Sequence, residues 1–175
     1  MNDWKHKLEI LEGDITEQEC DAIVNAANEQ LSPGGGVSGA IHSAAGPELA
    51  RECAQIGHCA TGDAVVTEAC DLPCRRVIHT VGPVYGSGAG GEEADLLASC
   101  YQTSLDLAAS EGLRSIAFPS ISTGIYGYPI EEASRIALAA IRDGLDANPE
   151  IERVLMVCFS DDDRREYEKT LSDLR

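Results

Sequence analysis

The chain has 175 residues, of which 43% are hydrophobic, and a formal net charge of −17 at pH 7. This length predicts one domain, spanning residues 1–175, with a core of its own. An excess of acidic side chains disfavours nucleic acid and anionic membranes as partners. The longest apolar runs are strand-sized or carry charges, and the N-terminus lacks the apolar core of a signal peptide, so we expect a cytoplasmic protein.

Composition suggests two further properties. Only three of the basic residues are lysine, and a lysine-poor, acid-rich surface is one that a high-salt cytoplasm selects, which gives the hypothesis of a halophilic source. The seven cysteines lack the paired spacing of zinc or redox motifs, so we expect reduced thiols. Cys53, His58 and Cys59 could meet at one ion, but no convincing fourth ligand accompanies them, and we expect neither metal nor cofactor.

Strand-like and helix-like segments alternate along the chain. Short runs rich in β-branched residues end in small or polar residues, as strands do before turns. The longer segments repeat apolar residues at helical spacing. The predicted strands lie within 7–16, 21–28, 63–69, 75–83, 115–121 and 153–160, and the predicted helices are 36–45, 47–56, 92–110, 129–147 and 161–175. This alternation favours an α/β/α layered domain.

The unusual polar and glycine-rich stretches follow predicted strands. They read GDIT (13–16), NAAN (25–28), GGGV (34–37), STGIYGYP (122–129) and CFSDD (158–162). In layered α/β domains ligands bind at the carboxyl ends of the strands. We therefore expect these five stretches to surround one binding site.

Two of the stretches are glycine-containing loops that enter helices. Backbone N–H groups at such a junction point into one concavity, at the positive end of the helix dipole, which suits a phosphate. Two such loops on one edge suit a diphosphate. The sequence GGGVSG has no lysine of the P-loop type and is not in the context of a dinucleotide fingerprint, so ATP hydrolysis and hydride transfer lose their main support.

Individual polar and aromatic residues in these stretches have two interpretations each. Asp14 could accept a hydrogen bond from an exocyclic amine, or it could cap the turn that follows. Phe159 and Tyr126 could stack on a base or cover a sugar, or they could anchor their loops by packing. Asn25 and Asn28 could orient a ligand or could serve turn chemistry. We assign His42 and His79 to structure.

Taken together, GDIT, VNAAN, GGGV-SGAIHSAAGPEL, VIHTVGP and FPSISTGIYGYP, in this order and at these separations, resemble the macro domain family, in particular its MacroD-like hydrolase branch. The resemblance runs from about Leu8 to Leu171. It implies a three-layer α/β/α fold with a mixed central sheet and a cleft for ADP-ribose. It also implies hydrolysis of the ester that joins ADP-ribose to an acidic side chain, or to acetate in O-acetyl-ADP-ribose.

The resemblance assigns roles to residues by motif position. Asp14, with Ile15 beside it, resembles the residue that takes the adenine amine, and Phe159 resembles the aromatic that stacks on the ring. Asn28 resembles the residue that orients the distal ribose, and Tyr126 the aromatic that packs against it. The two loops that resemble the diphosphate clasps comprise Gly34, Gly35, Gly36 and Val37, and Ser122, Thr123, Gly124, Ile125 and Tyr126.

One position departs from the family pattern. The MacroD-like motif reads G-G-G-V-D-G, and this chain has Ser38 where the aspartate stands. An ordinary serine hydroxyl cannot act as a general base at neutral pH, although it can hold a water by hydrogen bonds. Three functions stay open: a slow ester hydrolase that uses Asn28 and Ser38, a non-catalytic reader of ADP-ribosylated proteins, and a phosphatase acting on ADP-ribose 1″-phosphate. We expect a monomer whose partners are ADP-ribose and its conjugates.

Overall fold

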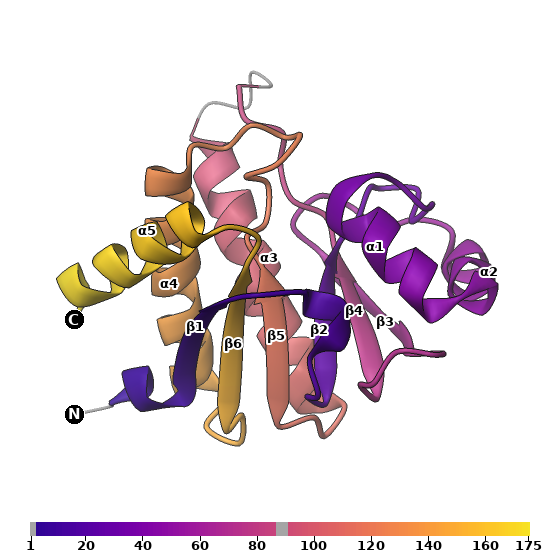
Figure 1. Cartoon of the computed structure of the whole chain (residues 1–175), viewed down its shortest axis with the longest axis horizontal. Helices are drawn as coiled ribbons and strands as arrows, with labels where there is room; N and C mark the ends of the chain where they lie inside the picture. Colours follow the sequence, from indigo (N-terminus) through magenta and orange to yellow (C-terminus); the bar gives the residue numbers. More distant parts are fainter. Residues whose placement is uncertain (1–2, 87–90) are drawn as a thin grey trace.

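The computed structural model describes residues 3–86 and 91–175. Six strands form one sheet in the order β1-β6-β5-β2-β4-β3, seen edge to edge in Figure 1. Their bounds are β1 Leu8–Glu12, β2 Ala22–Ala26, β3 Ala64–Glu68, β4 Arg76–Thr80, β5 Ser115–Pro119 and β6 Arg153–Cys158. Each strand falls inside the predicted run, which extends further because residues at its ends lie in the flanking loops.

The sheet is mixed, as expected. Five strands are parallel to their neighbours, and β3 pairs antiparallel with β4 at one edge. The carboxyl ends of β1, β6, β5, β2 and β4 therefore lie along the same edge of the sheet. The loops that carry the unusual residues leave from this edge.

Helices cover both faces of the sheet and make three layers (Figure 1). Their bounds are α1 Gly36–Ala45, α2 Pro47–Ile56, α3 Glu92–Ser110, α4 Ile130–Ala147 and α5 Asp161–Asp173. Alternate strand residues face opposite layers. Val154 and Met156 join the core beneath α3, α4 and α5, whereas Leu155 and Val157 join the core beneath α1 and α2. The three-layer α/β/α prediction is confirmed.

The helices match the predicted ranges with two differences. The last helix, α5, ends at Asp173, two residues before the predicted end. Pro129, expected in the first turn of its helix, is the residue before α4 and has an extended conformation with ψ 132°. Two single-turn 3₁₀-helices, Trp4–Lys7 and Ile15–Glu17, were not predicted, because segments this short carry no periodic signal. Of the glycine-rich run 85–91, which the sequence marks as a loop, residues 87–90 lie outside the described part. No described helix is long and apolar enough to cross a bilayer.

Candidate functional site

The predicted site residues lie along the carboxyl edge of the sheet in a definite order. Asp14 follows β1, Phe159 follows β6, the loop 120–128 follows β5 and the loop 27–35 follows β2. Neighbouring strands are about 4.8 Å apart, so the distance from β1 to β2 is about 14 Å. The edge therefore presents an elongated row of sites, with an aromatic and a carboxylate at one end and two glycine loops further along.

The N-terminus of α1 is the feature of this edge best suited to an anion. Gly35 is its N-cap, no side chain caps it, and its first turn contains no acidic residue. Its first N–H groups are consequently free for a ligand, at the positive end of the helix dipole. Gly36 has φ 56°, a backbone conformation that residues with a Cβ rarely adopt.

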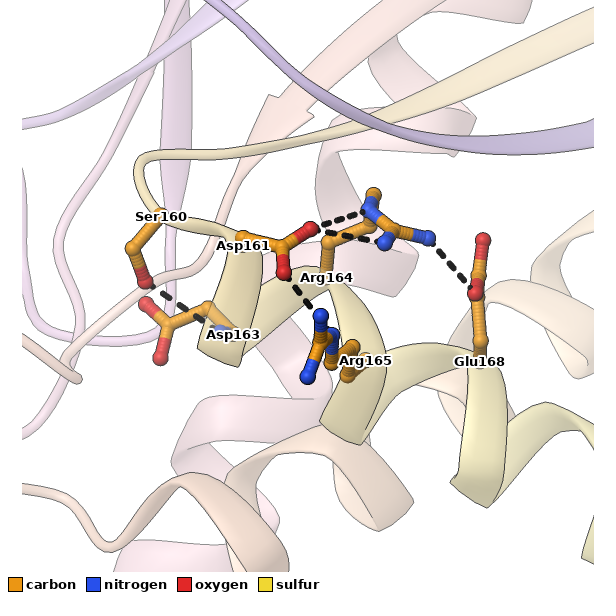
Figure 2. A network of polar contacts seen from close by, with 6 residues as sticks. All are labelled: Ser160, Asp161, Asp163, Arg164, Arg165 and Glu168. Atoms are coloured by element: carbon orange, nitrogen blue, oxygen red, sulfur yellow. Dashed lines mark hydrogen bonds and ion pairs between the residues drawn. The ribbon is translucent and has the colours of Figure 1, made fainter.

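The other four helices differ from α1 in this respect. Each of α2, α3, α4 and α5 has at least one acidic residue in its first turn. Figure 2 shows the case of α5, which begins two residues after Phe159 in the chain. The Ser160 hydroxyl accepts from the Asp163 N–H at 3.2 Å, and Asp161 pairs with Arg164 at 2.7 Å and with Arg165 at 2.8 Å. The N-terminus of α5 is thus capped by Ser160 and carries three acidic residues in its first turn, which already complement the helix dipole.

The two glycine-containing loops face each other across the edge. A β-carbon built on Gly35 would lie 3.8 Å from Cδ1 of Ile125, and one built on Gly34 would lie 3.7 Å from Nδ2 of Asn28. Ile125 is 88% exposed although it is aliphatic. A chain of phosphates between the loops would contact backbone N–H groups on one side and be covered by Ile125 on the other.

The loop 122–126 is held in place by hydrogen bonds to residues outside it. Ser122 has φ 68°, and its hydroxyl donates to the carbonyl of Pro83 at 2.8 Å. The Thr123 hydroxyl donates to the carbonyl of Ser120 at 3.0 Å, and the Tyr126 carbonyl accepts from the N–H of Tyr85 at 2.9 Å. Because these side chains are engaged, Ser122 and Thr123 offer a ligand their backbone, while the exposed Gly124 leaves the middle of the loop open.

At the other end of the row, Asp14 and Phe159 lie at the ends of adjacent strands. Asp14 caps the turn Ile15–Glu17, and its Oδ1 accepts from the N–H and the hydroxyl of Thr16 at 2.9 and 2.7 Å. Asp14 thus acts as a helix cap, as one of its two interpretations predicts. The exposed carboxylate retains a second oxygen, Oδ2, that can accept a hydrogen bond from a ligand. Ile15 is buried in the core and can offer only its backbone. Phe159 is 91% exposed, which packing does not explain.

Asn28 lies where the β2 loop turns toward the glycines. Its Oδ1 accepts from the N–H of Ser32 at 3.1 Å, and its Nδ2 donates to the carbonyl of Ser32 at 3.0 Å. These two bonds fix the amide plane next to Gly34. The side chain is therefore oriented before any ligand arrives. This orientation is compatible with both predicted roles of Asn28, which are to stabilise a turn and to orient a ligand.

Asn25, predicted as a ligand contact, lies beneath the loops, and its Oδ1 has no partner among the described residues. Its side chain is 1% exposed, and its Nδ2 donates to Nδ1 of His79 at 3.0 Å. His79 Nε2 then carries the proton and donates to the Thr67 hydroxyl at 2.9 Å. Burial, with His42 as a smaller influence, lowers the pKa of His79 to about 4. Asn25 and His79 form a neutral network beneath the site.

Ser38 also differs from its prediction. It occupies the first turn of α1, but it is 5% exposed, and its Oγ is buried with no hydrogen-bond partner in the described chain. The hydroxyl lies beneath the glycine loop, 4.0 Å from the position that a β-carbon on Gly34 would occupy. Burial lowers the pKa of His42, one turn further along the helix.

Two glycines that sequence reasoning missed shape the loops. A β-carbon on Gly39 would lie 2.6 Å from the carbonyl oxygen of Gly34, and one on Gly82 would lie 2.2 Å from Oγ of Ser122. Their positions within GGGVSG and TVGP could have marked them as candidates for close contacts. Which atom approaches each glycine, however, depends on tertiary contacts. Within residues 3–86 and 91–175, no three His, Cys, Asp or Glu side chains are grouped closely enough to hold a metal ion.

Comparison with known proteins agrees with this geometry. The family model described as "Macro domain" matches residues 24–137. A macro domain-containing protein of Chlorobaculum tepidum is 53% identical over 165 residues, which cover 94% of this chain and 95% of that protein. The O-acetyl-ADP-ribose deacetylase of Klebsiella pneumoniae is 52% identical over 168 residues, with coverages of 94% and 95%.

Solved structures give the same result. The Oceanobacillus iheyensis macrodomain with ADP aligns with a TM-score of 0.91 at 45% identity, covering 95% of this chain and 90% of that one. The Trypanosoma brucei macrodomain in complex with ADP-ribose aligns with a TM-score of 0.88 at 45% identity, with coverages of 94% and 69%. The chain belongs to the macro domain family.

Proposed function

We propose that this chain binds ADP-ribose along the carboxyl edge of its sheet. The observation that carries the proposal is the N-terminus of α1, which alone among the five described α-helices has no acid in its first turn. In a chain of net charge −17, a helix end free of carboxylates favours an anion. The glycine loop 34–36 supplies the close backbone approach that a diphosphate needs.

The order of the loops supports one direction for the ligand. Adenine would stack on Phe159 and donate its amine to the free oxygen of Asp14, the diphosphate would lie between the loops 34–37 and 122–126, and the distal ribose would reach Asn28 and Tyr126. The relatives and solved neighbours named for ADP, ADP-ribose or O-acetyl-ADP-ribose support this ligand class. We expect micromolar affinity, about −8 kcal/mol, for two clasped phosphates and one stacked base.

The reaction we propose is hydrolysis of an ester on the distal ribose. Water adds to the ester, the acyl–oxygen bond breaks, and the products are ADP-ribose and a carboxylic acid, either a protein side chain or acetate. Asn28 would orient the ribose, and the ligand's own phosphate oxygens would orient the water. Because Ser38 offers no base and its hydroxyl is buried, the rate would lack the contribution of about 10² to 10⁴ that a positioned base supplies.

A second candidate is a reader of ADP-ribosylated proteins that binds without hydrolysis. The specific observation in its favour is Ser38, whose Oγ is buried without a partner among the described residues, so the position of the motif's aspartate supplies no general base. Both candidates use the same cleft for the same ligand and differ only in turnover.

Two measurements test these proposals. Calorimetry with ADP-ribose, in salt that keeps the protein folded, tests binding, and absence of heat at millimolar ligand refutes it. Product analysis on a glutamate-ADP-ribosylated protein, O-acetyl-ADP-ribose and ADP-ribose 1″-phosphate separates the activities. Released ADP-ribose from an ester identifies the hydrolase, released phosphate a phosphatase, and neither product the reader.

A further inference from the structure

A cavity of about 300 Å³ lies at the end of the row of loops, beyond Asn28 and Tyr126, which both line it. It extends from the end of β2 across the end of β4 to the start of α3, on the side away from Asp14 and Phe159. A ligand whose diphosphate lies between the glycine loops and whose sugar contacts Asn28 would direct its next group here. Of its lining residues, only Asn28 and Tyr126 are assigned to the distal ribose.

The two walls of the cavity differ in chemistry. Its lining includes polar groups from Asn28, Glu29 and Thr61, the polar wall, and the apolar side chains of Pro83, Val84 and Leu96, the apolar wall. Val84 is 46% exposed. A group that fits between them needs an aliphatic part and hydrogen-bonding atoms on one side, as the side chain and backbone of a peptide have.

The polar wall is rigid and carries one negative charge. Oε2 of Glu29 accepts from the N–H of Thr61 at 3.3 Å and from its hydroxyl at 3.2 Å, and the carbonyl of Glu29 accepts from the N–H of Cys59 at 2.9 Å. No ion pair among the described residues neutralises Glu29. The wall thus favours N–H donors and cations and disfavours a second anion.

The size of the cavity discriminates between the two proposed ester substrates. A volume of 300 Å³ equals that of about ten waters, at about 30 Å³ each. An acetyl group has two carbon atoms and would leave most of this space to solvent. A glutamyl or aspartyl side chain with its neighbouring peptide units would fill it.

We propose that this cavity is the acyl-group subsite and selects ADP-ribose linked to a peptide, with uncharged or basic flanking residues, over the acetyl ester. This inference rests on the proposed binding of ADP-ribose. It concerns affinity for the group attached to the distal ribose, so it holds for a hydrolase and for a reader alike. Leu96 and Glu29 would be its specificity-determining residues.

The experiment measures binding, which does not depend on turnover. Four probes are titrated by calorimetry: ADP-ribose, a non-hydrolysable conjugate whose distal ribose carries an acetamide, and two conjugates that carry a glutamyl pentapeptide, one flanked by lysines and one by glutamates. We expect the lysine-flanked peptide to bind at least about tenfold more tightly than the acetamide, a difference of about 1.4 kcal/mol. The glutamate-flanked peptide should lose most of that gain.

Substitutions locate the gain in the cavity. Leu96→Trp should fill the cavity and abolish the extra affinity for the peptide conjugate, while the affinity for ADP-ribose changes less than about twofold. Leu96→Ala should weaken peptide binding because it removes apolar contacts without placing a larger side chain in the cavity. Leu107→Trp, three turns along α3 and also partly buried, is the matched control and should keep the gain. Glu29→Gln should equalise the two peptides, whereas Glu111→Gln, exposed at the end of α3, should not.

The possible failures are distinct. If ADP-ribose binds but the peptide conjugates bind no more tightly than the acetamide, the subsite is refuted and the proposed function stands. The same conclusion follows if Leu96→Trp and Leu107→Trp leave identical peptide gains. If ADP-ribose itself does not bind the wild-type chain, the proposed function is refuted together with the subsite.

Discussion

Gly39 lies against the backbone of Gly34, so that a β-carbon on Gly39 would come 2.6 Å from the Gly34 carbonyl oxygen. This contact holds the glycine loop down on the first turn of α1, where the N–H of Gly39 also donates to the carbonyl of Gly35 at 3.3 Å. The loop that faces the proposed diphosphate is therefore positioned by a glycine outside it.

Replacing Gly39 with alanine should displace the loop. We expect Gly39→Ala to lower the free energy of unfolding by about 1 to 3 kcal/mol, the usual cost of forcing a carbon into a packed site, and to weaken ADP-ribose binding at least about tenfold. Urea denaturation and calorimetry measure the two effects. Gly91→Ala, where no atom of the described residues lies within 4 Å of the new carbon, is the control, and an equal effect of both substitutions would contradict this account.

Asp14 should contribute both to the turn it caps and to the ligand. We expect Asp14→Ala to weaken ADP-ribose binding by about 1 to 3 kcal/mol, because a polar partner is lost, and to lower stability by about 1 kcal/mol, because a cap is lost. Asp14→Ser separates the roles, since serine can still cap Thr16 but cannot reach the adenine amine. Unchanged affinity in Asp14→Ala would leave Asp14 as a cap alone.

Ser38 gives the prediction about chemistry. Ser38→Asp introduces a carboxylate into the first turn of α1, and we expect it to raise single-turnover release of ADP-ribose at least about tenfold, within the range of a general base. Ser38→Ala should leave the wild-type rate unchanged, because Oγ is buried and unpartnered. If the wild-type chain matches Ser38→Asp, the missing aspartate does not limit the reaction.

The buried His79 should make stability depend on pH. Its pKa is lowered from 6.5 to about 4, so between these values the unfolded chain binds more protons than the folded one. Relative to low pH, neutral His79 therefore contributes about 3 kcal/mol to the free energy of unfolding. This contribution is complete above pH 6.5 and is lost as the pH falls through 4. Denaturation curves should show His79→Gln with a smaller loss of stability than the wild type over this window. Equal losses in both proteins would refute the role of His79.

Salt should stabilise the chain. A net charge of −17 produces self-repulsion that counterions screen, so we expect the melting temperature to rise from low to molar sodium chloride. A melting temperature that does not change with salt would remove the hypothesis of a halophilic source.

The alternation of strands and helices, and the loops at which the site lies, could be predicted from residue patterns alone. The apolar stripe of α3 is an example, since Leu97, Cys100, Tyr101, Ser104, Leu105 and Ala108 recur at helical spacing and are all buried. The pattern suffices because burial of one helix face and alternation of strand residues are local consequences of side-chain periodicity. The glycine loop 34–36 was predictable for the same reason, because its backbone requirements are local.

Which of the predicted polar residues lie against the glycine loop, and which are buried beneath it, depends on tertiary packing. Asn25 and Asn28 are three residues apart and chemically identical, yet one bonds His79 inside the sheet and the other borders the glycine loop. Ser38 and Gly39 are neighbours, and packing buries the hydroxyl of one and presses the other against Gly34. Strand order likewise placed Asp14 beside Phe159, which is 145 residues away in the chain, because β1 pairs with β6. Such contacts depend on how elements distant in sequence pack, and a one-dimensional pattern contains no information on that packing.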